Sequence, residues 1–281
     1  MGFNIGNIEK VVLIRESLPK DYHCDCRFCR KFAGTLKRPD GTYYSKWERN
    51  RYYAKIAASA HIAKTPLHIA RWAVQEFTKK GEWVLDPTIG IGTTAVEALI
   101  QQRNAAGMEI EYYENTIKNI EYTNWWGMKH QVIAGDAREV LKKLPNVREV
   151  DLVVTNPPYS GDEGQKVLRG KSGKYDKNFS NLAFLGESTE YYETMFSIYS
   201  QCKKMMKKGA FLVMGVKDMV REKRPYILHF FLGEVLEKLF TYRYMVLLPH
   251  YPPTLFMNTY NKRFPETRIP VYQTVLVFEN V

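Results

Sequence analysis

Short, continuous apolar runs alternate with amphipathic stretches over most of the chain. A run that is apolar at every position is typical of a strand buried on both faces, and apolar residues three and four positions apart are typical of a helix. Their regular alternation predicts an α/β domain with a mostly parallel sheet. The predicted strands are Trp83–Leu85, Ala105–Met108, Val132–Ile133, Leu152–Val154, Ala210–Gly215, Tyr242–Leu248 and Val271–Phe278. The predicted helices are Thr65–Lys80, Glu111–Tyr122, Glu190–Lys208 and Ile227–Phe240, and one more contains Val96, Leu99 and Ile100.

The first 59 residues do not follow this pattern. They hold one short candidate strand, Val11–Ile14, and then a segment, Lys20–Lys55, in which Lys and Arg are interleaved with aromatic residues. Such interleaving suits phosphate contacts and base stacking, so we expect Arg49, Arg51 and Tyr52 to bind substrate. The alternative is a solvated arm whose aromatic side chains pack on the main domain.

We therefore divide the chain into an N-terminal extension, residues 1–59, and a main domain, residues 60–281. Within the main domain, residues 160–188 are polar and rich in Gly and Lys, which predicts a mobile substrate loop. A length of 281 residues suits one large domain with an extension. The oligomeric state stays open, and a monomer is compatible with the sequence.

The formal net charge of +11 favours a polyanionic partner such as nucleic acid, although general basicity without such a partner is the alternative. No apolar run is long enough to span a membrane, and the N-terminus lacks the apolar core of a signal peptide. The expected compartment is the cytoplasm.

Three of the four cysteines, Cys24, Cys26 and Cys29, lie together after His23. One interpretation is zinc binding by these four residues. The simpler alternative is that the three cysteines are reduced thiols in a basic segment. Structural zinc usually takes two separated ligand pairs, and the fourth cysteine, Cys202, lies far away in a helical pattern. We therefore predict no metal site.

A glycine-rich loop follows the first strand of the main domain, with the sequence Asp86-Pro87-Thr88-Ile89-Gly90-Ile91-Gly92-Thr93-Thr94-Ala95. An acidic residue, a Gly-x-Gly turn and a helix after a strand are typical of a nucleotide-cofactor loop, because glycine lets the backbone approach the ligand closely. The third glycine of the dinucleotide fingerprint is missing, and no Gly-Lys-Ser/Thr of a P-loop follows. The predicted cofactor contacts in this loop are Asp86, Thr88, Gly90, Gly92 and Thr93.

Acidic residues also end the next two strands. Glu109 is expected to accept hydrogen bonds from ribose hydroxyls, and Asp136 is expected to accept one from an adenine amine. The alternatives are a surface charge for Glu109 and a helix-capping aspartate for Asp136.

The strand Leu152–Val154 leads into Asn156-Pro157-Pro158-Tyr159. Because proline has no N–H for the ladder, the two prolines end the strand in a rigid turn at the edge where α/β sheets bind ligands. An amide, carbonyls and an aromatic ring there suit a nucleobase held by its exocyclic amine. We therefore predict all four residues of this turn as catalytic.

These segments together resemble the motifs of S-adenosylmethionine-dependent nucleic-acid amino-methyltransferases, which methylate adenine N6 or cytosine N4. The resemblance spans about His61–Val281, and His61–Pro66 is similar to the family's segment against the cofactor's methionine end. It implies S-adenosylmethionine as cofactor, with Lys64 and Thr65 as further contacts. It also implies a Rossmann-like class I methyltransferase fold: a mostly parallel, seven-stranded sheet with helices on both faces and an antiparallel strand in its final hairpin.

The sequence determines the substrate less closely than the cofactor and the fold. Sequence-specific DNA members carry a large target-recognition domain for which this chain has no room, and that favours a structured RNA. Stand-alone relatives thought to modify cytosine N4 in ribosomal RNA are similar in organisation, yet asparagine before Pro-Pro, here Asn156, is commoner in adenine-N6 members. We favour cytosine N4 in ribosomal RNA. The alternatives are adenine-N6 or cytosine-N4 methylation of DNA and, in another class, a non-catalytic RNA-binding protein.

Overall fold

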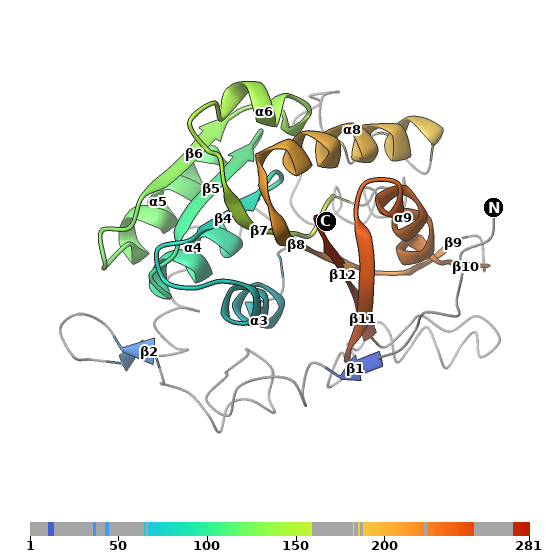
Figure 1. The fold of residues 1–281 in the computed structure, drawn as a ribbon, viewed down its shortest axis with the longest axis horizontal. Helices are drawn as coiled ribbons and strands as arrows, with labels where there is room; N and C mark the ends of the chain where they lie inside the picture. Colours follow the sequence, from blue (N-terminus) through green and yellow to red (C-terminus); the bar gives the residue numbers. More distant parts are fainter. Residues whose placement is uncertain are drawn as a thin grey trace.

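The computed structural model describes residues 11–13, 36–37, 43–44, 65, 67–158, 182, 185, 188–221, 224–249 and 272–281 (Figure 1). Their main feature is an eight-stranded sheet with the strand order β1-β11-β12-β8-β7-β4-β5-β6. Strand β12 is antiparallel to both of its neighbours, and every other pair in this sheet is parallel. The strands are β1 (Val11–Leu13), β4 (Trp83–Asp86), β5 (Asn104–Glu109), β6 (His130–Ala134), β7 (Val150–Thr155), β8 (Met206–Val216), β11 (Thr241–Pro249) and β12 (Tyr272–Glu279).

The predicted Rossmann-like class I methyltransferase fold is confirmed. Seven strands of the sheet come from residues 60–281, and the last of them, β12, is the expected antiparallel strand. The eighth strand, β1, comes from the N-terminal extension and pairs in parallel with β11 at the edge of the sheet. Two small antiparallel pairs complete the strands: β2 (Leu36–Lys37) with β3 (Tyr43–Tyr44), and β9 (Met219–Arg221) with β10 (Arg224–Tyr226).

Helices cover both faces of the sheet (Figure 1). Because side chains alternate along a strand, Val84, Leu152 and Val154 pack into one core, and Leu85 and Val153 pack into the other. The first core includes α3 (Leu67–Phe77), α4 (Thr93–Ile100) and α5 (Tyr113–Thr123). The second includes η3 (Ala137–Glu139), α6 (Val140–Lys143), α8 (Thr189–Met205) and α9 (Leu228–Glu237).

The predicted boundary between the helix Glu190–Lys208 and the strand after it is wrong. We expected the helix to continue to Lys208 and end at Gly209, but α8 ends at Met205 and β8 begins at Met206. The cause is strand pairing, because Met206 lies opposite Val150 of β7 and the Gly209 N–H donates to the Asn280 carbonyl at 2.6 Å. Helix α3 also ends earlier than predicted, at Phe77 rather than at Lys80.

The strand order reverses between β4 and β7, so these adjacent parallel strands send their connections to opposite sides. In open α/β sheets the ligand binds outside the carboxyl ends of the strands at such a point. The sequence motifs that follow β4, β5, β6 and β7 therefore lie along one edge of the sheet, here called the carboxyl edge. Within the described part of the chain, no helix has the length and apolar character required to cross a membrane.

Candidate active site

The glycine-rich loop between β4 and α4 is shaped by two glycines with left-handed backbone angles, at φ 58° for Gly90 and φ 89° for Gly92. Side chains of α5 hold the loop from outside. Thr116 Oγ1 donates to the Gly90 carbonyl at 2.5 Å, and Asn119 Nδ2 donates to the Ile91 carbonyl at 2.7 Å. The backbone angle favours glycine at Gly92, and a Cβ there would also lie in tight contact with Thr116, 3.0 Å from its Cγ2.

Asp86 ends β4 and is fully buried. Its Oδ1 accepts from the Thr88 N–H at 3.1 Å, and its Oδ2 accepts from Thr94 Oγ1 at 2.7 Å, so the carboxylate joins the two ends of the loop. The pKa of this carboxyl is raised to about 7. Burial is the largest cause, and the nearby charge of Glu109 is a smaller cause in the same direction. Asp86 can therefore change its charge near neutral pH.

Two threonines of this loop, Thr88 and Thr93, were predicted to contact cofactor. Thr88 Oγ1 lies 3.1 Å from the hydroxyl of Thr155, the last residue of β7, and this hydrogen bond links the loop to the neighbouring strand. Thr93 is buried at the start of α4.

Glu109 ends β5, where the sequence predicted a ribose acceptor. Its Oε1 accepts from the backbone N–H groups of Glu111 and Tyr112 at 2.8 and 3.0 Å, which fixes the side chain at the carboxyl edge. Only 7% of the residue is exposed, and burial raises the pKa of the carboxyl. The alternative of a surface charge does not fit this degree of burial.

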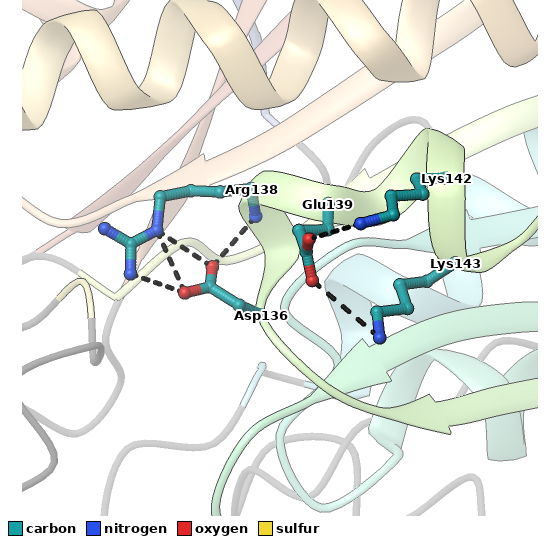
Figure 2. Close-up of polar contacts among 5 residues, drawn as sticks. All are labelled: Asp136, Arg138, Glu139, Lys142 and Lys143. Carbon is teal, nitrogen blue, oxygen red and sulfur yellow. Dashed lines mark hydrogen bonds and ion pairs between the residues drawn. The ribbon is translucent and has the colours of Figure 1, made fainter.

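Asp136 follows β6 and caps η3, as its alternative interpretation predicted, because its Oδ1 accepts from the Arg138 N–H at 2.9 Å. The Arg138 guanidinium also contacts both carboxylate oxygens, with Nε at 3.0 and 2.9 Å and Nη2 at 2.5 Å (Figure 2). A carboxylate has about four acceptor positions, and these four contacts occupy them, so a further donor would have to displace or share one of them. Its contact with an adenine amine stays a prediction.

The turn after β7 brings Asn156 against β8. Because Thr155 lies opposite Met214, the next residues, Asn156 and Gly215, come together at the carboxyl edge. A Cβ at Gly215 would lie 2.9 Å from both Cγ and Nδ2 of Asn156, so the asparagine side chain occupies the space that glycine leaves free. Asn156 Oδ1 is buried and has no hydrogen-bond partner among the described residues.

Gly215 is a residue of the site that the sequence did not reveal. The only signal was a small residue at the end of an apolar strand, and the strand that would face it was unknown. Of the other residues in the predicted turn, Pro157 is buried and Pro158 is half-buried.

Several predicted residues lie outside the described part of the chain: Tyr159, Lys64, Arg49, Arg51 and Tyr52, and also His23, Cys24, Cys26 and Cys29. Thr65 is described and half-buried, just ahead of α3. Among the described residues, no group of His, Cys, Asp and Glu is arranged to hold a metal ion, and Cys202 is a buried free thiol.

A buried ion pair joins α3 to α4, the helix that follows the glycine-rich loop. Arg71 of α3 donates to Glu97 of α4 through Nε at 2.8 Å and Nη2 at 3.1 Å, and the two side chains are 6% and 0% exposed. Such a two-pronged pair fixes both the distance and the orientation of the helices. It therefore positions the start of α4, where the loop ends.

Comparisons with known proteins agree with this site. Residues 29–120 match the family model N6_N4_Mtase, described as DNA methylase. The chain is 44% identical over 63 residues to the type II methyltransferase M.BglI of Bacillus subtilis, covering 22% of this chain and 18% of that protein. It is 25% identical over 205 residues to the tRNA (guanine(10)-N2)-dimethyltransferase of Methanocaldococcus jannaschii, covering 69% of this chain and 53% of that protein.

Among solved structures, an S-adenosylmethionine-dependent methyltransferase from Agrobacterium tumefaciens has a TM-score of 0.50 at 13% identity, covering 79% of this chain and 64% of that one. This likeness shows the fold, which is that of the Rossmann-like, S-adenosylmethionine-dependent methyltransferases.

Residues 29–120 match the model of the N6/N4 amino-methyltransferase family, which supports the resemblance seen in the sequence. The matched region includes the glycine-rich loop and Glu109 but ends before Asn156. The chain spans less than two thirds of the length of each of the two curated relatives.

Proposed function

We propose that this protein transfers a methyl group from S-adenosylmethionine to the exocyclic amino group of a nucleobase in nucleic acid. The observation on which the proposal rests is the buried Asn156 Oδ1 at the carboxyl edge, which has no hydrogen-bond partner among the described residues. An unpaired buried acceptor costs about 1–3 kcal/mol, so it is expected to gain a donor when substrate binds. An amino group is such a donor.

The residues around the glycine-rich loop fit the cofactor. Glu109 is held where it can accept from ribose hydroxyls, and the backbone at Gly90 and Gly92 lets a ligand approach closely. Asp86 supports the loop through Thr88 and Thr94. Bound S-adenosylmethionine supplies an electrophilic methyl group. Direct contacts from Lys64, Thr65, Thr93 and Asp136 remain predictions from the sequence.

In this mechanism the protein makes the amine a better nucleophile. The amine lone pair is conjugated into the base, so the free amine attacks poorly. Hydrogen bonds from the amine to Asn156 Oδ1 and to the Pro157 carbonyl favour a pyramidal nitrogen, and the lone pair is then free to attack. Tyr159 stacks on the base, worth about 1–3 kcal/mol by comparison with other stacked bases. Positioning of this kind can supply roughly 7–11 kcal/mol of the barrier.

For the substrate, we propose cytosine N4 in structured ribosomal RNA, modified in the cytoplasm. An RNA target is supported by the aligned tRNA-modifying relative, whose match covers 69% of this chain. That relative is named for guanine N2, which is also an exocyclic amine, and this makes guanine N2 in tRNA a second candidate. DNA methylation at adenine N6 or cytosine N4 is the third, supported by the family description and by M.BglI.

We also propose that residues 1–59 form a basic extension that binds substrate. Residues 60–281 then form the methyltransferase domain. Arg49, Arg51 and Tyr52 are the proposed substrate contacts in the extension. The net charge of +11 supports a polyanionic partner.

The experiment that tests the proposal is incubation with methyl-labelled S-adenosylmethionine and, separately, DNA, tRNA, free ribosomal RNA and ribosomal particles. Nucleoside mass spectrometry then distinguishes N4-methylcytosine, N6-methyladenine and N2-methylguanine. The Asn156→Ala variant is the matched control, because label that survives this change does not come from the proposed site. Absence of label from every nucleic acid, with cofactor binding intact, would overturn the proposal.

A further inference from the structure

Lys217 is the first residue beyond β8, at the carboxyl edge. It is two residues from Gly215, whose Cα lies against the Asn156 side chain, so the Lys217 Cα is within about 7 Å of the Gly215 Cα. The parallel strands β4 and β7 end at the same edge. Lys217 therefore belongs to the immediate surroundings of the proposed site.

Within the described residues, Lys217 is unusual among the basic side chains that are buried or half-buried. The other four each have an oxygen partner: Arg71 pairs with Glu97, Arg103 donates to the Thr78 carbonyl, Lys203 donates to the Leu239 carbonyl, and Lys207 pairs with Asp151. Lys217 is half-buried and has neither an ion pair nor a hydrogen bond.

The cost of this arrangement is visible in the electrostatics of the side chain. Burial lowers the pKa of the Lys217 ammonium. A half-buried cation without a partner destabilises the free protein, because it loses water without gaining an acceptor. Lysine residues without a structural role usually keep the ammonium in water at the end of an extended stem.

We propose that Lys217 binds a backbone phosphate of the substrate nucleic acid next to the target base. This inference rests on the proposed function and adds a contact that positions the substrate. The described residues at the carboxyl edge include the carboxyls Asp86, Glu109 and Asp136, and a cation near Asn156 would offset their effect on an approaching polyanion. An ammonium serves as a compact point charge for a phosphate.

The test compares Lys217→Ala and Lys217→Arg with the control Lys208→Ala. Lys208 lies on the same strand near its amino end and is exposed. The probe is a fluorescently labelled single-stranded RNA of mixed sequence, and its affinity is measured by anisotropy over a range of salt concentrations. We expect Lys217→Ala to weaken binding about tenfold. The arginine variant should keep most of the affinity.

The salt dependence separates a phosphate contact from a purely structural effect. Loss of one phosphate contact on a single strand reduces the slope of log affinity against log salt by about 0.7. We expect this reduction for Lys217→Ala and an unchanged slope for Lys208→Ala. A wild-type slope in Lys217→Ala would overturn the inference while leaving the proposed methyl transfer intact.

Calorimetry with S-adenosylhomocysteine completes the test. Unchanged cofactor affinity in Lys217→Ala supports the phosphate contact, because cofactor binding reports an intact loop. Weakened cofactor affinity together with unchanged RNA affinity would instead assign Lys217 to the cofactor's carboxylate and overturn the inference. Failure of the wild-type protein to bind or methylate any nucleic acid would overturn the proposed function, and this inference with it.

Discussion

The buried Asp86 makes the stability of the free protein depend on pH. Its pKa is about 7, compared with 3.8 for an ordinary aspartate, and the cause is burial. The folded protein therefore keeps a proton on this carboxyl that the unfolded chain releases at much lower pH. Such a group stabilises the fold fully below pH ~4, and that contribution is lost as the pH rises through about 7.

The size of the effect follows from the two pKa values. A difference of about 3 in pKa corresponds to ~4 kcal/mol between the protonated and the ionised state. Two hydrogen bonds, from Thr88 and Thr94, already reduce the cost of the charge. From about pH 5 to about pH 7.5, the free energy of unfolding should fall by roughly 2–3 kcal/mol because of this group.

The assay is urea unfolding of the cofactor-free protein at several pH values, for wild type and Asp86→Asn. Asparagine keeps the shape and cannot ionise, so this variant should lack most of the decline and gain stability relative to wild type as the pH rises. Glu109→Gln is measured in parallel, because burial also raises the pKa of Glu109 and its contribution has the same sign. A difference between Asp86→Asn and wild type that stays constant from about pH 5 to about pH 8 would refute the reasoning.

The same charge should couple to the cofactor. S-adenosylmethionine carries positive charge, which favours the ionised form of a nearby carboxyl, so binding near pH 7 should release a proton. Calorimetry in two buffers with different ionisation enthalpies measures this release. Asp86→Asn should reduce it.

Three further predictions concern single contacts. Asn156→Ala should lower turnover by about 100-fold, which is comparable with losing one preorganised polar group in other enzymes, and it should leave cofactor affinity unchanged. Single-turnover rates measure this effect, and a wild-type rate would exclude Asn156 from catalysis. Gly215→Ala should destabilise the fold by about 1–3 kcal/mol, because its Cβ overlaps the Asn156 side chain. That cost should largely disappear in the Asn156→Ala background, and equal costs in both backgrounds would contradict the contact. Glu97→Gln should lower the free energy of unfolding by about 3–5 kcal/mol, since it removes the carboxylate that pairs with the buried Arg71 guanidinium; a loss below ~1 kcal/mol in chemical denaturation would show that water reaches the pair.

The sequence by itself determined the class of fold and indicated the strand ends at which several candidate site residues lie. A continuous apolar run such as Leu152–Val154 predicted a strand within one or two residues of its observed bounds. A strand buried on both faces is apolar at nearly every position, so it can be recognised from its own sequence. The glycine-rich loop was likewise predictable, since Gly90 and Gly92 adopt backbone angles that other residues rarely take. These features are local, so local residues suffice to indicate them.

Tertiary structure alone decided the features that depend on a partner far along the chain. Strand β8 begins at Met206 instead of Ala210 because Met206 lies opposite Val150, and helical propensity cannot reveal that pairing. The contact between Asn156 and Gly215 depends on the register of β7 against β8, and the edge position of β1 depends on its pairing with β11. Register and burial are properties of two segments at once, so each segment's own sequence leaves them open.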